Sequence, residues 1–255
     1  MSEDWAARLA DGAPIDERVA VVVAHADDET LWTGSALPRL RDCLLIHLTD
    51  GAPRDMTDAR RLGIATREDY ARLRADELDA AVLALGADPE RIGYGVVDQE
   101  TVEHLPDVAD RLAADCRDAA VIVTHPYEGG HPDHDAAALA ARLAADRIGR
   151  PLVEFACYHE VDGARVFGRF WPDQDHPERV RPLPASEREI VGRALAAHTS
   201  QKAVFGDHLP DAERWRVAPR YDFAAPPPPG RALYDGFGWA MTSAKWRERA
   251  RAALA

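Results

Sequence analysis

The sequence predicts a single-domain, Rossmann-like α/β fold, a three-layer sandwich in which helices cover both faces of a mainly parallel sheet. Short apolar runs alternate with helix-like segments as far as about residue 160, which indicates βαβ units. These runs are nearly continuous and do not alternate with polar residues, as is typical of strands covered on both faces. The sequence contains no internal repeat and no linker between two cores. Residues 1–255 are therefore expected to form one domain with its core at about 17–160.

The expected elements follow one another along the chain. Five apolar runs are predicted to be buried strands: VAVVV (19–23), CLLIHL (43–48), RIGYGV (91–96), AAVIVT (119–124) and LVEFACY (152–158). Apolar residues recurring at steps of three and four predict helices over 59–85, 105–116 and 132–148. Further on, 186–198 and 238–254 are helix-compatible, whereas the PPPP run at 226–229 is expected to lie extended on the surface.

The composition excludes several classes of protein. A net charge of −13 argues against nonspecific binding to nucleic acid or to anionic membranes. No apolar run approaches the roughly 18 residues that span a bilayer, and the first residues lack the pattern of a signal peptide. Cys43, Cys116 and Cys157 are odd in number and widely spaced, so they are expected to be reduced core cysteines in a cytoplasmic protein.

Two polar clusters follow two of the predicted strands. AHADDE (24–29) comes directly after the first strand, and THPYEGGHPDHDAA (124–137) follows the strand at 119–124. Ligands of open parallel sheets bind beyond the carboxyl ends of the strands, so the two clusters are expected to converge at that edge. The acids Asp27, Asp28 and Glu29 repel one another, and a bound cation is the simplest offset.

The residue types in these clusters suit a metal site. Two histidines and one carboxylate leave a coordination position open for water, as catalytic zinc sites do. The ion would lower the pKa of that water to about 7, and a neighbouring carboxylate would accept its proton. Taken alone, an acidic run is usually a solvated helix start and an HPDH run a capped turn. Both at matching strand ends favour a functional site.

Together these motifs resemble the paired signatures of the PIG-L/LmbE-like deacetylases, metal-dependent hydrolases of N-acetylated amino-sugar conjugates. Ala26 departs from this likeness, since the family usually has proline there. The resemblance extends along much of the chain and rests on these segments: AHADDE (24–29), LTDGA (48–52), Arg74 with Glu77, YGVVD ending in Asp98, GGHPDHDAA (129–137) and HTSQK (198–202).

The resemblance implies a role for each matching residue. His25, Asp28 and His134 would be the metal ligands, and Asp27 the general base that takes a proton from the bound water. His131 would stabilise the tetrahedral oxyanion and pass a proton to the leaving amine. It further implies orientation of His131 by Asp133 and substrate contacts by Arg74 and Asp98. Apart from the resemblance, Tyr127, on the loop before GGHPDH, and Tyr158, at the end of the strand 152–158, are expected near the pocket as substrate contacts.

The resemblance implies a hydrolase that removes an N-acetyl or related N-acyl group from an amino sugar or its conjugate, by cleaving a linear C–N bond. Residues 161–255 would pack on the core and complete the substrate side. The cofactor would be one divalent ion, Zn²⁺ or alternatively Fe²⁺. The only expected partner is the small-molecule substrate, and the oligomeric state stays open. The acidic net charge favours neutral or amine-bearing sugars unless arginines create a local positive field.

Several alternatives remain at this point. The same site would also serve an amidase acting on a thiol- or antibiotic-type glycoconjugate. A nonhaem iron oxygenase shares the ligand set, but βαβ alternation does not suggest the fold usual for that class. A nucleotide-binding Rossmann protein would carry a G-x-G-x-x-G after the first strand, which is absent. A catalytically silent, metal-binding relative is disfavoured by the presence of every expected catalytic group.

Overall fold

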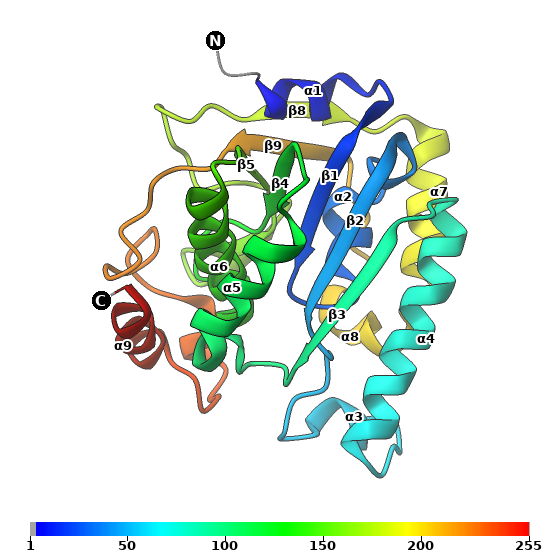
Figure 1. The fold of residues 1–255 in the computed structure, drawn as a ribbon. Helices are drawn as coiled ribbons and strands as arrows, with labels where there is room; N and C mark the ends of the chain where they lie inside the picture. Colours follow the sequence, from blue (N-terminus) through cyan, green and yellow to red (C-terminus); the bar gives the residue numbers. More distant parts are fainter. Residues whose placement is uncertain (1–3, 255) are drawn as a thin grey trace.

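The computed structural model describes residues 4–254, and its centre is a seven-stranded sheet (Figure 1). The strand order is β3-β2-β1-β4-β5-β9-β8. The first five strands in this order are parallel, whereas β9 runs antiparallel to β5 and β8 antiparallel to β9. The structure therefore confirms the predicted, mainly parallel α/β sheet.

The elements have the following bounds. The strands are β1 Ile15–Val23, β2 Leu40–Thr49, β3 Glu90–Val96, β4 Val121–Thr124, β5 Leu152–Phe155, β6 Tyr158–Val161, β7 Ala164–Phe167, β8 Arg179–Pro182 and β9 Ala212–Val217. The α-helices are α1 Trp5–Asp11, α2 Asp28–Thr33, α3 Thr57–Arg61, α4 Arg67–Leu85, α5 Leu105–Asp115, α6 Pro132–Ile148, α7 Ala185–Leu195, α8 Lys202–Phe205 and α9 Ser243–Leu254. The short 3₁₀ helices are η1 Leu37–Arg39, η2 Thr101–His104, η3 Thr199–Gln201 and η4 Leu233–Gly236.

Both faces of the sheet are covered, because alternate residues of the central strand β1 enter two separate cores. Ala20 and Val22 pack with α5, α6 and α9 on one face, whereas Val19 and Val21 pack with α1, α2, α4 and α7 on the other. All four side chains are at most 1% exposed. Burial of apolar area on both faces explains why the strand sequences read as continuous apolar runs.

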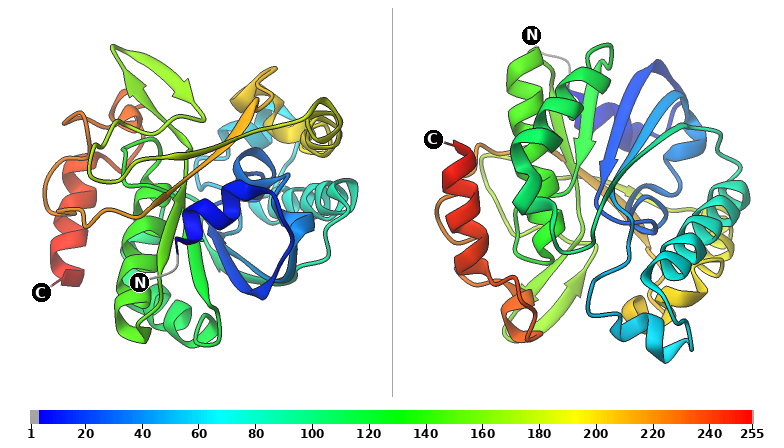
Figure 2. Two further views of the ribbon diagram at one scale, coloured as in Figure 1. Left: turned by 90° about the horizontal axis from the view of Figure 1, so that it is seen from above. Right: turned by 60° about the horizontal axis from the view of Figure 1, so that its bottom comes forward.

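Two sequence-based boundaries need correction. The run 152–158 is not one strand: β5 ends at Phe155, and Tyr158 begins a separate hairpin of β6 and β7. In Figure 2 this hairpin projects beyond the main sheet. The segment 59–85 contains two helices, because Gly63 adopts a φ of 73° after α3 and the side chain of Thr66 then caps α4.

Beyond residue 160 the chain extends the same fold. Strands β8 and β9 join the sheet edge, and α9 packs beside α5 and α6 (Figure 1). The indole of Trp246 in α9 donates a hydrogen bond of 2.9 Å to the carbonyl of Pro132. Residues 226–229 form neither helix nor strand, as predicted, but Pro227 is buried. Within residues 4–254, none of the helices combines the length and apolar character that a membrane span requires.

Candidate active site

The two polar clusters meet where the sheet reverses its strand order. The neighbouring parallel strands β1 and β4 both end at this edge, and the chain continues from β1 to one side of the sheet and from β4 to the other. Such a switch point forms a crevice at the carboxyl ends of the strands. His25, Asp27 and Asp28 follow β1, and His131 and His134 follow β4 at the start of α6. The predicted convergence is therefore present.

The three predicted metal ligands lie at the spacing of a tetrahedral site. His134 Nε2 is 3.3 Å from His25 Nδ1 and 3.3 Å from Asp28 Oδ1, and His25 Nδ1 is 3.4 Å from Asp28 Oδ2. Zinc bonds of about 2.0–2.2 Å in tetrahedral geometry place neighbouring ligand atoms about 3.3–3.6 Å apart. Burial and its surroundings lower the pKa of His134 to about 4, which leaves its imidazole neutral. These residues fit a divalent ion.

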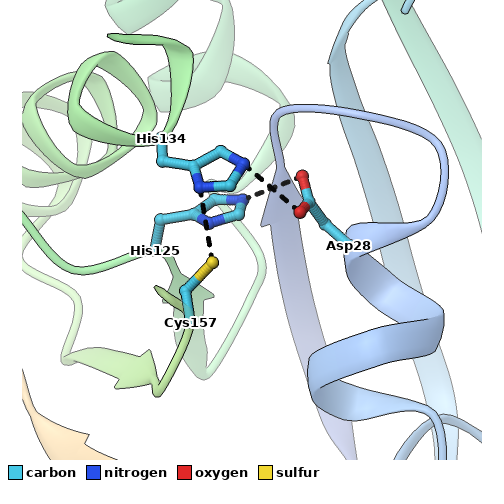
Figure 3. A group of neighbouring side chains, drawn as sticks. All are labelled: Asp28, His125, His134 and Cys157. Atoms are coloured by element: carbon cyan, nitrogen blue, oxygen red, sulfur yellow. Dashed lines mark hydrogen bonds and ion pairs between the residues drawn. The ribbon is translucent and has the colours of Figure 1, made fainter. Parts of the chain in front are cut away.

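Two further side chains support this set (Figure 3). Cys157 and His125 join Asp28 and His134 in one group of buried potential ligands. However, His125 Nε2 accepts the backbone N–H of Ala24 at 3.1 Å, so its lone pair is engaged. Cys157 Sγ lies 3.3 Å from His134 Nδ1, the nitrogen that faces away from the ion position. Contacts of this kind fix the orientation of a ligating imidazole.

Asp133 has a different geometry from the one the resemblance implies. Its carboxylate lies 3.3 Å from His25 Nε2 and accepts the backbone N–H groups of Gln99 and Thr101. The nearest carboxylate contact to His131 is 3.9 Å, and instead the backbone N–H of Asp133 donates to His131 Nδ1 at 3.1 Å. Asp133 thus contacts the predicted ligand His25 through its carboxylate and His131 through its backbone N–H.

Asp98, predicted to contact substrate, also lies against His25, at 3.2 Å from Nε2. Burial disfavours a charged His25, but Asp98, Asp133 and Asp28 together raise its pKa well above the usual value. A proton on His25 therefore balances the acidic cluster when no ion is bound. An ion bound at Nδ1 would displace the Nδ1 proton of the charged ring and leave the Nε2 proton that faces Asp98 and Asp133.

Asp27, the predicted general base, is held in a strained backbone conformation beside the ligands. Its φ of 151° and ψ of −26° are rarely adopted by residues other than glycine. The Arg74 guanidinium donates to Asp27 Oδ2 at 3.1 Å and to the carbonyl of Ala26. Burial raises the pKa of the Asp27 carboxyl to about 6, although Arg74 opposes the rise. A base with this pKa is suited to accept a proton near neutral pH.

The sequence suggested that one bound cation would offset the repulsion among the three consecutive acids. In the structure, each acid instead has its own set of partners. Asp27 pairs with Arg74, and Asp28 faces the ion position. Glu29 is fully buried and lies 3.1 Å from His47 Nε2 and 3.7 Å from His198 Nε2. Burial opposes its ionisation, yet these two histidines hold the pKa of Glu29 well below its usual range.

Glu29 also explains the position of the base. Its Oε2 accepts the backbone N–H of Asp27 at 3.0 Å, which stabilises the unusual φ of that residue. Sequence analysis assigns no role to Glu29 beyond its place in the acidic run, and His47 is a buried residue of β2. His198 lies in the HTSQK segment, which the family resemblance highlighted without assigning it a function.

His131, the predicted oxyanion residue, is neutral in this setting. Burial and the neighbouring His25 lower its pKa to about 3. Because His131 Nδ1 accepts a backbone N–H, the proton of the neutral ring is on Nε2. Its ring packs edge-on against Trp239 at 5.0 Å between centroids. His131 is thus a hydrogen-bond donor at the site through Nε2.

The site lines a cavity of about 540 Å³, whose wall includes all three predicted ligands as well as Asp27 and His131. Arg74, Asp98 and Tyr158 line it as predicted for substrate contacts. Tyr127 does not: it is 1% exposed, donates to the carbonyl of Ala225 and stacks on Trp246. The prediction for Tyr127 therefore needs correction, because its side chain belongs to the core beneath α9.

A carboxylate on α4 holds the segment that carries His198 in place. Glu77, one turn after Arg74, accepts hydrogen bonds from Thr199 Oγ1 at 2.6 Å, Ser200 N at 2.8 Å and Ser200 Oγ at 2.6 Å. Glu77 is 5% exposed. Arg74 and Glu77 thus connect α4 to Asp27 directly and to Glu29 through His198, which gives the R-x-x-E and HTSQK motifs a common structural role.

Replacing Glu77 with Ala should lower the free energy of unfolding by about 2–4 kcal/mol, because three donors lose a buried, charged acceptor. Chemical denaturation of the metal-loaded protein would measure the loss. The matched control is Asp79→Ala on the same helix, since Asp79 is exposed and forms an ion pair with the surface residue Arg91. That change should stay within about 0.5 kcal/mol. Equal effects of the two variants would contradict the role given to Glu77.

Comparisons with known proteins agree with this site. Residues 20–145 match the family described as PIG-L: GlcNAc-PI de-N-acetylase. The chain is 30% identical over 168 residues to a 1D-myo-inositol 2-acetamido-2-deoxy-alpha-D-glucopyranoside deacetylase 2 of Catenulispora acidiphila, covering 56% of this chain and 55% of the relative. It is 28% identical over 154 residues to a probable N-acetyl-alpha-D-glucosaminyl L-malate deacetylase 2 of Bacillus cereus, covering 58% of this chain and 68% of that protein.

Among solved structures, the zinc-inhibited form of teicoplanin deacetylase Orf2 is similar in fold. The TM-score is 0.60 at 18% identity, covering 80% of this chain and 99% of the other. N,N'-diacetylchitobiose deacetylase of Pyrococcus horikoshii gives a TM-score of 0.51 at 15% identity, covering 80% and 84%. The family match contains both polar clusters of the site. Residues 20–145 are therefore similar to this family, and the remainder of the chain lies outside the match.

Proposed function

We propose that this protein is a metal-dependent hydrolase that removes an N-acetyl or related N-acyl group from an amino sugar or amino-sugar conjugate. One observation carries the proposal: three ligands at tetrahedral spacing lie beside a carboxylate with a raised pKa in the lining of a cavity. A hydrolase needs both parts, an ion and a base within reach of the same water. The names of the relatives support the same chemistry on N-acetylated sugars.

The roles of the residues follow from the geometry. A bound divalent ion would polarise the amide carbonyl and lower the pKa of a water molecule at the site. Asp27 accepts the proton of the attacking water, and Arg74 keeps the carboxylate aimed at the cavity. His131 donates its Nε2–H to the oxygen that becomes negative in the tetrahedral intermediate. Once it holds this proton, Asp27 is one candidate to return it to the leaving amine, and His131 is the other.

We assign Zn²⁺ as the ion, held by His25, Asp28 and His134. Two imidazoles and one carboxylate with tetrahedral spacing suit Zn²⁺, whereas Fe²⁺ in such a ligand set usually expands to six-coordination. The mainly parallel α/β fold also differs from the fold that is usual for the nonhaem iron oxygenases with the same ligand set. Asp98 and Asp133 would serve the bound ion by accepting the proton on His25 Nε2.

Hydrolysis of an antibiotic-type or thiol-conjugate amide by the same site is the second candidate. Its supporting observation is the volume of the cavity, which at about 540 Å³ exceeds the volume that a single N-acetylhexosamine requires. The remainder of the cavity would hold the group joined to the sugar. The two candidates share one mechanism and differ only in that group.

The proposal is tested by acetate release. Zn²⁺-loaded protein would be incubated with N-acetylglucosamine, its glycosides and N-acylated glycopeptide antibiotics, and acetate or the free amine would be quantified. Metal-dependent release from any of the sugars supports the deacetylase, and the best substrate decides between the two candidates. If no compound is hydrolysed while Zn²⁺ remains bound, the proposed chemistry is either wrong or aimed at a larger acceptor, and the silent-relative alternative gains.

A further inference from the structure

One wall of the cavity is formed by an element outside the main sheet. The hairpin β6–β7 makes its own two-stranded sheet, and it contributes Tyr158, Arg165 and Phe167 to the cavity lining. Tyr158 packs closely on the start of the metal-binding segment, since a Cβ added to Gly130 would meet its carbonyl oxygen at 2.1 Å. The hairpin is thus fixed at its base, and Arg165 lies on the strand that returns toward the cavity.

The guanidinium of Arg165 lies among aromatic rings. Its Cζ is 5.3 Å from the ring centroid of Tyr158, 5.6 Å from that of Phe167 and 5.7 Å from that of Phe237. One nitrogen, Nη1, donates to the carbonyl of Val204 in α8 at 3.1 Å. Cation–π contacts hold a guanidinium in place while leaving its in-plane N–H groups available. Arg165 is therefore positioned and retains free donors.

Arg165 differs from the other arginines that line the cavity in having no carboxylate partner among the described residues. Arg61 is paired with Asp58, and Arg74 with Asp27. Among the described residues, no carboxylate forms an ion pair with Arg165. The cross-strand neighbour of Arg165 is Glu160, which would be its natural partner in an antiparallel hairpin.

Glu160 has other partners. Its carboxylate forms an ion pair with Arg231 and accepts the backbone N–H of Gly163 at 2.9 Å. The hairpin thus satisfies its own acid without using Arg165, although an opposite pair of charges on facing strands is normally favourable. The positive charge of Arg165 is left for a group that enters the cavity.

We infer that Arg165 is a binding site for one oxyanion, a carboxylate or a phosphate, on the part of the substrate joined to the N-acetylated sugar. The inference rests on the proposed function and makes it narrower. A planar guanidinium with free N–H groups is suited to bind a carboxylate or phosphate by two parallel hydrogen bonds. The protein is acidic overall, so this local charge would select a single anionic group and not a polyanion.

The test uses two glycosides of equal size. The carboxymethyl glycoside of N-acetylglucosamine carries one carboxylate, and the 2-hydroxyethyl glycoside is its neutral counterpart. Binding to Zn²⁺-loaded protein would be measured by calorimetry, and kcat/KM by acetate release. N-acetylglucosamine 1-phosphate serves as a third ligand, which separates phosphate from carboxylate recognition. The protein should prefer the carboxymethyl over the hydroxyethyl glycoside by about tenfold or more at low salt, with the difference in KM.

The variants locate the preference. In Arg165→Gln the ratio of the binding affinities for the carboxymethyl and hydroxyethyl glycosides should fall to about one. Arg165→Lys should restore part of this preference because the positive charge returns. The matched control is Arg169→Gln, an arginine just beyond the hairpin that does not line this cavity. It should keep the ratio of the unmodified protein.

Equal affinity of the unmodified protein for both glycosides would overturn the inference, as would a preference that survives in Arg165→Gln. Failure of the proposed function appears separately. If no glycoside releases acetate, the deacetylase proposal falls, while the calorimetric ratio still decides whether Arg165 selects an anion.

Discussion

Replacing Asp27 with Asn should lower kcat for acetate release by about 10²- to 10⁴-fold while leaving the metal content unchanged. The amide has the shape of the carboxylate and keeps an oxygen to accept the Arg74 hydrogen bond, but it cannot take a proton from water. Asn also tolerates a positive φ better than most residues, so the strained turn should persist. Steady-state kinetics together with metal analysis of the purified variant would show the result.

The pH dependence gives an independent measurement of the same residue. Asp27 acts in its ionised form, so kcat/KM should fall as the pH decreases through its pKa. Burial raises that pKa to about 6, and a bound cation would lower it, which places the acidic limb at or below about pH 6. The residual activity of Asp27→Asn should lack this limb. A limb that survives in the variant would assign it to another group and remove Asp27 as the base.

Chelation should abolish activity, and added Zn²⁺ should restore it. The ion binds only the folded site, so at 100 times its Kd it should stabilise the protein by about 2.7 kcal/mol. In His134→Ala one of three ligands is lost, and the affinity for Zn²⁺ should fall by at least about 100-fold, since even the loss of a supporting residue costs 10- to 100-fold. Metal titration and thermal unfolding with and without Zn²⁺ would measure both effects.

The control for this variant is His176→Ala. His176 is half-buried and pairs with Asp173, away from the cavity lining. It should retain full metal affinity. A different result would move the ion: if Cys157→Ala lost the metal while His134→Ala and His25→Ala kept it, the ligand set named here would be wrong.

Much of this architecture could be predicted from the sequence because local patterns decide it. The helix predicted over 132–148 has these bounds in the structure, since Pro132 suits the first turn and Gly149 ends the helix in a left-handed conformation. The convergence of His25 with His134 was also predictable, because parallel strands at a switch point place their carboxyl ends together. Periodicity and topology need no knowledge of side-chain partners.

What the sequence did not reveal depends on side-chain directions. Asp133 follows His131 in the chain, yet its carboxylate turns to His25, more than 100 residues away. Glu29 is one more acid in an acidic run until the structure places it between His47 and His198. Tyr127 follows a strand end near the site, but its ring stacks on Trp246 of α9. Long-range partners of this kind leave no periodic trace.

The separation of the β6–β7 hairpin from the main sheet has a consequence for how such an enzyme changes over generations. Within residues 4–254, no backbone hydrogen bond joins the hairpin to the seven-stranded sheet, and the proposed ligands His25, Asp28 and His134 all lie outside it. Apart from Tyr158, which packs on Gly130, the length and sequence of the hairpin are therefore free to vary without direct effect on these three side chains. Grafting foreign hairpins between residues 159 and 167 offers a route to new selectivity in a chain that keeps its proposed metal ligands.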